Sequence, residues 1–455
     1  MGEEQEQFEE QHIAYLIDLL ERKDYKKLVN ELRHMNEVDI ALFMEALPDD
    51  ETAVVFRMLP KEMSAEVFAH LERDTQYRVA EAFTDEETTN MLDQLFVDDA
   101  VDFLEEMPAN MVNRILQLAN PERRSVLNRF LQYPEDSAGS IMTAEYTRLK
   151  QDMTVAEAIA HLRKFGEDRE TIYTCYVTND ERVLEGVMSV KSLLLSQDDE
   201  RIGDIMETDV ISTRTDTDRE EVANLLAKYN FLSIPVTDHE HRLVGIVTVD
   251  DALDVLTQEA TEDFEKMAAM SPSERPYLKT SFWQHGIHRI TWLIILMVSG
   301  LINGVILENN EAAFVTYPLL VTFIPMLTDT GGNVGSQSST LIIRGMTLGE
   351  IGFKDFFRVI FKESATSLLM GVILSGFNFL RVYLVYHDVM AALILALAMM
   401  ATIVMAAVLG GVLPMIAKRM KIDPAIMAAP LITTLVDAAS LAIYFAIATA
   451  LLPLL

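Results

Sequence analysis

A single carboxylate stands in an apolar stretch near the C-terminus. The segment APLITTLVDAASLAIYFAIATALL, Ala429 to Leu452, is long enough to cross a membrane and carries one charged residue, Asp437. An unpaired carboxylate near mid-bilayer costs roughly 2.5–3.5 kcal/mol on insertion scales, so it is expected to face a cavity or a partner. A pair with Arg381, the one basic residue inside another apolar stretch, is the alternative. Asp437 and Thr433, one turn earlier, are therefore candidate ligands of a hydrated cation.

A second polar group interrupts another apolar stretch, IPMLTDTGGNVGSQSSTLIIRG, Ile324 to Gly345. The Gly-rich middle predicts a break in an apolar helix, which is tolerated where the backbone lines protein or water. Small residues alone indicate close helix packing. The polar side chains indicate a water-filled path instead, and they are Asn333, Gln337, Ser338, Ser339 and Thr340. Asp329 and Gly332 of the same stretch complete the candidate ion path.

A third group is acidic and precedes all the apolar stretches. The run DDALDVLTQEATEDFEKMAAM has a helical length and concentrates carboxylates, which are the hard oxygen ligands of weak Mg²⁺ or Ca²⁺ sites. A solvated helix face is the alternative. The candidate regulatory ligands, from this run and from two earlier segments, are Asp98, Asp102, Asp218, Glu220, Asp251, Asp254, Glu259, Glu262 and Asp263.

Membrane-length stretches begin only after Ile287, and five are predicted, at about 290–307, 312–343, 364–386, 390–417 and 425–452. Basic residues gather before the first, between the second and third, and between the fourth and fifth stretches. Short cytoplasmic loops collect Lys and Arg, so this alternation predicts a cytosolic N-terminus and an external C-terminus. An all-α membrane domain of five helices is expected at 284–455.

The first half of the chain divides into two further regions. Residues 1–135 show apolar spacings of three and four, cut by Pro and Asp-Asp breaks such as LPDD and EMPAN, which predicts an all-α stack of short helices. Residues 136–256 contain an internal repeat in which Ile-Met, a helix, two strands and a helix recur. This repeat resembles a tandem pair of CBS domains, which implies one α/β disc. Residues 257–283 form the acidic connecting helix and linker.

Charge, cysteine content and the lack of catalytic motifs restrict the classes of function that this chain can have. Net charge is −33, yet residues 286–455 hold nine acidic and nine basic residues, so the imbalance lies in residues 1–285 and argues against nucleic acid as a partner. Cys175 is the single cysteine, as suits a reducing compartment, and MGEEQEQFEE lacks the pattern of a secretory signal. No nucleophile with a paired base and no phosphate-cradling loop is evident, so no enzyme is expected.

The chain resembles the MgtE family of magnesium channels and transporters along nearly its whole length. The resemblance rests on the order of these regions and on two segments, TDTGGNVGSQSSTLIIRG and DPAIMAAPLITTLVDAASLAIYFAIA. The resemblance implies a homodimer of the cytoplasmic membrane, a central pore lined by the second and fifth spans with Asp437 as the ion-site carboxylate, and a connecting helix that closes the pore when cytosolic Mg²⁺ binds. Ala429 and Ser336 stand where members of the family often carry Asn, which affects coordination near the pore.

Three alternatives stay open. The same architecture could carry Mn²⁺ or Co²⁺, although oxygen ligands and the lack of Cys or His in the candidate pore favour a hard ion. A membrane-anchored Mg²⁺ sensor that transports nothing is a different class. Adenine nucleotide is a further candidate ligand, because CBS pairs often hold ribose with Thr-x-x-Asp, which TVDD matches at Thr248 and Asp251, while the first copy has SVKS.

Overall fold

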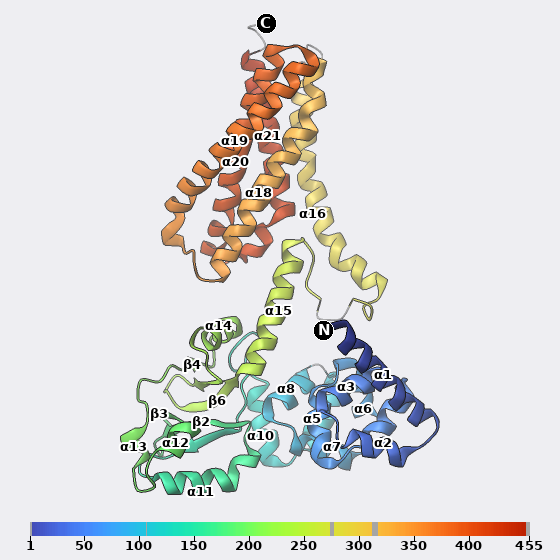
Figure 1. The fold of residues 1–455 in the computed structure, drawn as a ribbon, viewed down its shortest axis with the longest axis vertical. Coiled ribbons are helices and arrows are strands. Elements are labelled where there is room, and N and C mark those ends of the chain that lie inside the picture. Colours follow the sequence, from blue (N-terminus) through green and yellow to red (C-terminus); the bar gives the residue numbers. More distant parts are fainter. Residues whose placement is uncertain (1, 106, 274–276, 312–316, 452–455) are drawn as a thin grey trace. The chain divides into compact units, whose positions relative to one another are not determined.

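The structure is a computed structural model that describes residues 2–105, 107–273, 277–311 and 317–451 (Figure 1). It divides into two compact units, Met1–Leu256 and Thr257–Leu455, each described here by itself. The first unit contains a stack of short helices followed by two small sheets, and the second consists of long helices.

Short helices fill the first part of the first unit, as the breaks in the sequence predict. Pro48, Pro60 and Pro108 are the N-caps of three of them, and Thr84 forms a capping box with Glu87. A proline cannot continue a helix but suits its start, so these prolines separate helices of only two or three turns, α4, α5 and α9, from the helices before them. The helices are α1 (Gly2–Glu21), α2 (Tyr25–Leu32), α3 (Glu37–Glu45), α4 (Asp49–Phe56), α5 (Lys61–Ala69), α6 (Arg73–Glu81), α7 (Asp85–Gln94), α8 (Val97–Glu105), α9 (Ala109–Leu118) and α10 (Pro121–Phe130).

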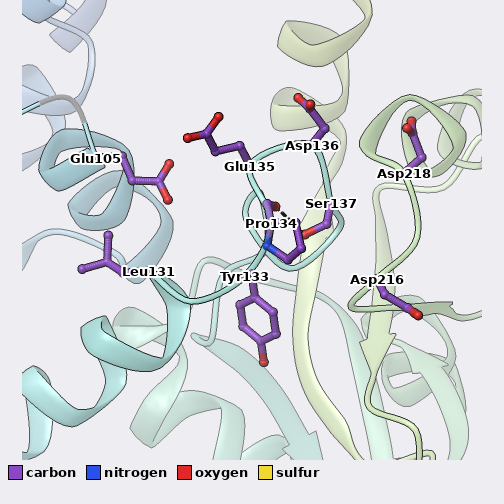
Figure 2. Close-up of a pocket in the computed structure, with 9 residues that line it drawn as sticks. All are labelled: Glu105, Leu131, Tyr133, Pro134, Glu135, Asp136, Ser137, Asp216 and Asp218. Carbon is purple, nitrogen blue, oxygen red and sulfur yellow. Dashed lines mark hydrogen bonds between the residues drawn. The ribbon is translucent and has the colours of Figure 1, made fainter.

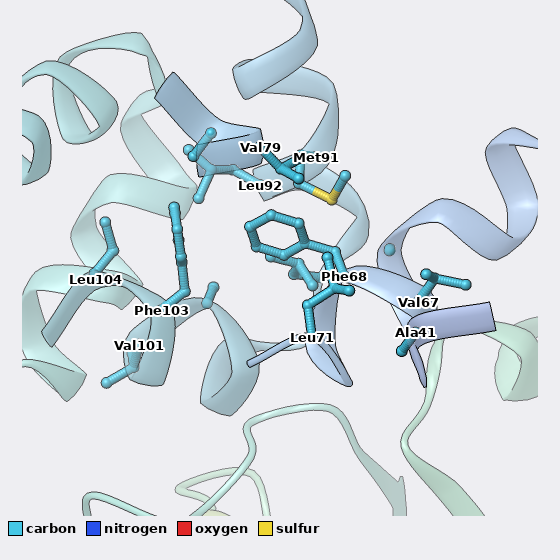
Figure 3. Close-up of a cluster of buried hydrophobic side chains, with 14 of the residues drawn as sticks. Ala41, Val67, Phe68, Leu71, Val79, Met91, Leu92, Val101, Phe103 and Leu104 are labelled. Atoms are coloured by element: carbon cyan, nitrogen blue, oxygen red, sulfur yellow. The ribbon is translucent and has the colours of Figure 1, made fainter. Parts of the chain in front are cut away.

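An aromatic core joins these helices. The ring of Phe68 lies 5.0 Å from that of Phe103 in an edge-to-face contact (Figure 3). It also lies 6.0 Å from the ring of Phe56. Because the three residues come from α5, α8 and α4, the core fixes α8 and its acidic first turn to the rest of the stack.

Two sheets of the same topology confirm the repeat. The first has the order β1-β2-β3 and the second β4-β5-β6, each with one parallel and one antiparallel pair. Buried Tyr176 of the first copy shares a hydrogen bond of 2.7 Å with Ser233 of the second, so the copies form one body. Cys175 beside it is fully buried. The strands are β1 (Tyr146–Leu149), β2 (Thr171–Thr178), β3 (Leu184–Ser189), β4 (Thr213–Arg214), β5 (Ser233–Thr237) and β6 (Leu243–Thr248).

Helices flank the strands in the same order in each copy. They are α11 (Val155–Phe165), η1 (Gly166–Asp168), α12 (Val190–Leu195), α13 (Ile202–Ile205) and α14 (Arg219–Tyr229). The acidic helix α15 (Val249–Met267) follows β6 directly and crosses the boundary between the two units along the chain.

The second unit contains α16 (Phe282–Asn309), η2 (Pro318–Phe323), α18 (Ile324–Thr347), η3 (Phe353–Asp355), α19 (Phe356–Tyr386), α20 (Val389–Arg419), η4 (Pro424–Met427) and α21 (Ala429–Leu451). Among the described residues, four helices are long and apolar enough to span a membrane, Phe282–Asn309, Phe353–Tyr386, Val389–Arg419 and Pro424–Leu451. The count of five is therefore not reached, because polar residues lower the hydropathy of α18. The expected start of the second span at 312–316 lies outside the described residues.

The expected break in this polar stretch is wrong. Helix α18 runs without interruption through Gly331 and Gly332. The glycines keep their helical conformation because neighbouring helices contact them closely: a Cβ on Gly331 would lie 2.8 Å from Thr402 Cγ2 of α20 and 2.9 Å from Val436 Cγ1 of α21. Small residues thus serve helix packing here, as in other membrane helices.

Candidate pore and regulatory cation sites

The polar side chains of α18 divide between two faces. Asp329, Asn333, Gln337 and Thr340 are exposed in the single chain, and their spacings of four, four and three residues place them on one side of the helix. Asn333 Nδ2 donates a 3.3 Å hydrogen bond to Asp329 Oδ2. This side of α18, the polar face, therefore offers amide, hydroxyl and carboxylate oxygens in a row.

Two of the predicted path residues belong to the opposite, packed side. Ser338 donates a 2.6 Å hydrogen bond to Glu363 of α19, and Ser339 donates one of 2.7 Å to the carbonyl oxygen of Met427. Both serines are buried. They hold α18 against its neighbours and do not extend the polar face.

Asp437 lies beside the polar face. It is half-buried on α21 and within electrostatic range of Asp329. Thr433, one turn earlier, approaches α18 so closely that a Cβ on Gly332 would lie 2.8 Å from Thr433 Cγ2. The structure thus brings together the five predicted pore residues, Asp437, Thr433, Asn333, Gly332 and Asp329, on two adjacent helices.

The alternative partner of Asp437 lies elsewhere. The Arg381 guanidinium is 5.6 Å from the centre of the Phe323 ring and contacts Met326 Sδ at 3.4 Å. Ser336 is half-buried on α18, whereas the side chain of Ala429 lies outside the described part of the structure. An arginine thus does not neutralise the carboxylate in the described structure.

A second set of carboxylates gathers in the first unit. Asp98 is 9% exposed, and its Oδ1 has no hydrogen-bond partner among the described residues. Burial and the charges of Asp99, Asp251 and Glu170 raise the pKa of Asp98 well above its usual range. We call these residues, with Glu145 and Asp250, whose charges act on the same groups, the acidic cluster.

The acidic cluster has more carboxylates than nearby cations, since among the described residues His70 acts on Asp99 and Arg123 pairs with Glu145. Burial raises the pKa of Asp99 to about 6, that of Asp251 to about 7 and that of Glu170 to about 8, with further contributions from neighbouring carboxylates. A divalent cation would neutralise such a group. The described residues nevertheless contain no group of three or more His, Cys, Asp or Glu already arranged around one metal position.

One cation anchors the edge of the cluster. The Arg123 guanidinium donates to Glu145 Oε1 at 3.1 Å and to the Leu92 carbonyl oxygen at 3.1 Å, and the other oxygen of Glu145 accepts from Val97 N at 3.4 Å. Glu145 therefore fastens the start of α8 to the first CBS copy. Glu145 and Glu170 were missed by the sequence analysis, because they enter the cluster from the first copy, far from the acidic run.

The remaining predicted regulatory residues lie in other places. Asp254 is exposed on α15, and Asp102 is exposed on α8. Asp218 caps α14 by accepting from Glu220 N at 2.9 Å. It also lines a cavity of about 730 Å³, shown in Figure 2, whose other carboxylates are Glu105, Glu135, Asp136 and Asp216. The nine predicted ligands therefore do not form one site.

The end of α15 carries a further charged group, entirely within the second unit. Lys266 is paired with Glu262 and, at 2.6 Å, with Asp423, which was not predicted. Burial and the charge of Asp423 raise the pKa of Asp263. Glu259 is half-buried on the same helix. An ammonium group thus already compensates part of the charge of this acidic region.

The residues predicted to bind nucleotide lie beside the acidic cluster. Thr248 donates a hydrogen bond to Asp251, which faces the acidic cluster. A cavity of about 550 Å³, the CBS cavity, lies instead at the matching positions of the first copy, Ser189 and Ser192, with Tyr176 and Phe231 also in its wall. Thr248 and Asp251 are not among its lining residues.

Comparison with known proteins decides the family. The family model of a divalent cation transporter, MgtE, matches residues 324–447, that of the MgtE intracellular N domain matches 35–136, and that of the CBS domain matches 202–258. The magnesium transporter MgtE of Thermus thermophilus is 36% identical over 98% of this chain and 99% of its own length. This chain belongs to the MgtE family.

Other MgtE proteins agree. MgtE of Bacillus subtilis is 34% identical over 94% of each chain. The crystal structure of the cytosolic domain of the Mg²⁺ channel MgtE in complex with ATP is 37% identical, with a TM-score of 0.51, and covers 53% of this chain and 99% of that one. The soluble part of a magnesium transporter matches with a TM-score of 0.52 and 30% identity. MgtE proteins are divalent cation transporters, so the membrane-transport prediction is confirmed.

Proposed function

We propose that this MgtE protein conducts Mg²⁺ through the cytoplasmic membrane as a homodimer, along a path between the polar face of α18 and Asp437 of α21. The observation that carries this proposal is a row of oxygen-bearing side chains, Asp329, Asn333 and Gln337, exposed on a helix that packs among long apolar helices. Such a row is costly against lipid and favourable against water. On this proposal α18 also spans the membrane, as the second of five spans in chain order.

Ion selectivity follows from the chemistry of the path. Carboxylate, amide and hydroxyl oxygens suit hard divalent cations, and Mg²⁺ keeps most of its water when it binds. Two copies of Asp437 near one axis would attract a divalent ion more strongly than a monovalent one, since the attraction scales with the charge of the ion. The half-buried position of Asp437 supports contact through water.

Closure is proposed to depend on cytosolic Mg²⁺ acting at the acidic cluster. Burial, with a further contribution from neighbouring carboxylates, raises the pKa of Asp98 and Asp251, so at low Mg²⁺ it costs free energy to keep these groups ionised inside the compact unit. Mg²⁺ would draw them together, which favours a compact soluble unit and a closed pore. Since no ligand group is preassembled among the described residues, the ion itself assembles the site.

The CBS cavity is proposed to hold an adenine nucleotide as a second regulator. Its wall contains hydroxyl groups from Ser189 and Ser192 and the aromatic ring of Phe231, which suit a ribose and a base respectively. ATP bound to the cytosolic domain of a related MgtE supports this assignment.

Flux through reconstituted protein tests the proposed path. In liposomes with a Mg²⁺-sensitive dye inside, Asp437→Ala is expected to reduce Mg²⁺ entry at least about tenfold, because the pore loses its only carboxylate on α21. Glu308→Ala, which removes an exposed carboxylate on α16, is the matched control and should conduct normally. Wild-type flux from a folded Asp437→Ala protein would refute the path.

A further inference from the structure

A cavity of about 350 Å³ lies where the loop after α18 meets the end of α20. Three basic residues line it, Lys418, Arg419 and Lys421. Apolar side chains form the rest of its wall, with Ile351, Phe353 and Met415 among them. We call it the basic cavity. Its combination of three cations with an apolar wall differs from the polar face and from the acidic cluster.

Contacts with the protein hold two of these cations in place. Lys418 Nζ donates to the carbonyl oxygen of Met346 at 3.3 Å. The Arg419 guanidinium lies 5.3 Å from the centre of the Phe353 ring, as in a cation–π contact. Both heads are thus positioned at the cavity before any ligand binds, which lowers the entropy lost on binding.

Lys421 adopts a backbone conformation that favours glycine. Its φ of 61° lies in the left-handed region, at the turn where Ile422 N donates to the Ala417 carbonyl oxygen at 2.9 Å and ends α20. Helices commonly end in this way with glycine, because a side chain adds strain there. Lys421 therefore occupies, at some backbone strain, a position that glycine would suit better, and its ammonium group lines the cavity.

The nearby carboxylates are engaged elsewhere. Asp423 accepts from Lys266 at 2.6 Å and from Ala425 N at 2.8 Å. Asp355 accepts from Gly352 N at 3.1 Å and lies 3.7 Å from Arg358. Within the described parts of the chain, no carboxylate lines the cavity or pairs with its three cations. The cavity therefore carries an excess of positive charge that an anion would balance.

Aromatic rings extend from the cavity wall toward α19, since the ring of Phe353 lies 5.5 Å from that of Phe356, which lies 5.5 Å from that of Phe357. Phe353 is 51% exposed, and Phe357 and Phe361 on the first turns of α19 are 82% and 77% exposed. Exposed aromatic rings beside basic residues at the end of a membrane helix are typical of the interface between lipid and water. A ligand with both an anionic head and an apolar tail fits this surface better than a free anion.

We propose that the basic cavity binds the phosphate-bearing headgroup of an anionic phospholipid, with its acyl chains along Phe357 and Phe361. Arg419 would contact the phosphate oxygens through its planar donors, and Lys418 and Lys421 would add charge. Basic pockets between membrane helices bind such headgroups on the cytoplasmic side. This site is separate from the proposed ion path, so either assignment can fail without the other.

Lipid binding to the full chain tests the proposal. Native mass spectrometry of detergent-solubilised protein would be titrated with phosphatidylglycerol or phosphatidylcholine. Wild type is expected to prefer phosphatidylglycerol, and Arg419→Gln with Lys421→Gln should weaken that binding about thirtyfold, the loss expected for two cations facing an anionic lipid. Arg344→Gln with Lys362→Gln removes the same charge from exposed positions outside the cavity and should leave the preference unchanged.

A second variant separates binding from folding. Lys421→Gly suits the left-handed backbone, so it should leave the unfolding temperature in detergent unchanged or higher while still weakening phosphatidylglycerol binding. Three results would overturn the proposal: equal binding of both lipids by wild type, equal losses in the two double variants, or displacement of phosphatidylglycerol by equimolar inorganic phosphate, which would indicate a site for free anions.

Discussion

At the scale of single residues, glycine decides how closely the helices of the second unit approach. A Cβ on Gly410 of α20 would lie 2.2 Å from the backbone oxygen of Gly335 of α18. Gly335 in turn faces Ile432 of α21, where a Cβ would lie 2.7 Å from its Cγ2. The contact at Gly410 is with backbone, which cannot rotate away, so this position admits no side chain without movement of a helix.

Gly410→Ala is therefore expected to destabilise the second unit by about 1–3 kcal/mol, the usual cost of overpacking. The measurement is the midpoint of thermal unfolding in detergent, followed by near-UV circular dichroism. Gly376→Ala is the matched control, because a Cβ on Gly376 meets nothing within 4 Å. Equal midpoints for the two variants would show that α18 and α20 pack less closely than described.

At the scale of elements, α8 brings charge to the CBS pair. Its first turn carries Asp98 and Asp99, whose carboxylates would ordinarily favour a helix N-terminus. Here burial outweighs that benefit, because the helix is fastened against the first copy through Arg123 and Glu145. The fold thus keeps like charges together at a cost to its own stability.

This cost predicts an unusual pH dependence. The pKa values of Asp99, Asp251 and Glu170 are raised to about 6, 7 and 8, above the ordinary value of about 4 that the unfolded chain has. Between about pH 4 and pH 8 the folded state then binds more protons, so stability falls as pH rises. In chelator, the unfolding midpoint of the isolated first unit, Met1–Leu256, should rise as pH falls from 8 to 6.

The same pH series measured with saturating Mg²⁺ is the control. Bound Mg²⁺ favours the ionised carboxylates, so at saturating Mg²⁺ the midpoint should change much less over the same pH range. A midpoint that rises with pH in chelator would mean that these carboxylates are solvated and carry ordinary pKa values.

Many helix starts and the paired strands can be predicted from short stretches of the sequence. Pro48, Pro60 and Pro108 mark helix starts in the sequence as in the structure, and the repeated strand pairs identify the CBS copies. Residues that meet only through tertiary packing could not be predicted, as Glu170 and Asp423 illustrate. The predicted break in α18 was wrong because a glycine weakens a single helix but allows close helix packing inside a bundle.

At the scale of the whole molecule, charge is divided unevenly. The net charge of −33 lies in residues 1–285, while the remaining residues are neutral in sum. In the proposed dimer this charge would be doubled on the side proposed to be cytosolic, and bound divalent ions would reduce it. The proposed gating therefore depends on repulsion that is spread over the soluble unit and is concentrated at the acidic cluster.

Neutralising carboxylates of the acidic cluster should make the pore less sensitive to closure by internal Mg²⁺. Patch-clamp recordings of Asp98→Asn with Asp251→Asn are expected to show currents that persist at internal Mg²⁺ concentrations that close the wild type, with the half-closing concentration raised about tenfold or more. Glu181→Gln with Asp199→Asn removes equal charge from exposed loops and should close normally. Identical closure in both double variants would exclude the cluster as the sensor.

The burial of Cys175 has a practical consequence for spectroscopy and labelling. This thiol is the only one in the chain, it is fully buried, and burial raises its pKa to about 12, so it stays protonated and unreactive at neutral pH. The natural sequence is thus a ready background for single introduced cysteines. In reconstituted protein, a charged thiol reagent should modify Asn333→Cys, Gln337→Cys and Thr340→Cys quickly and Ser339→Cys slowly. Uniform rates would contradict a water-exposed polar face, and the pattern of rates would trace the wetted side of α18 one residue at a time.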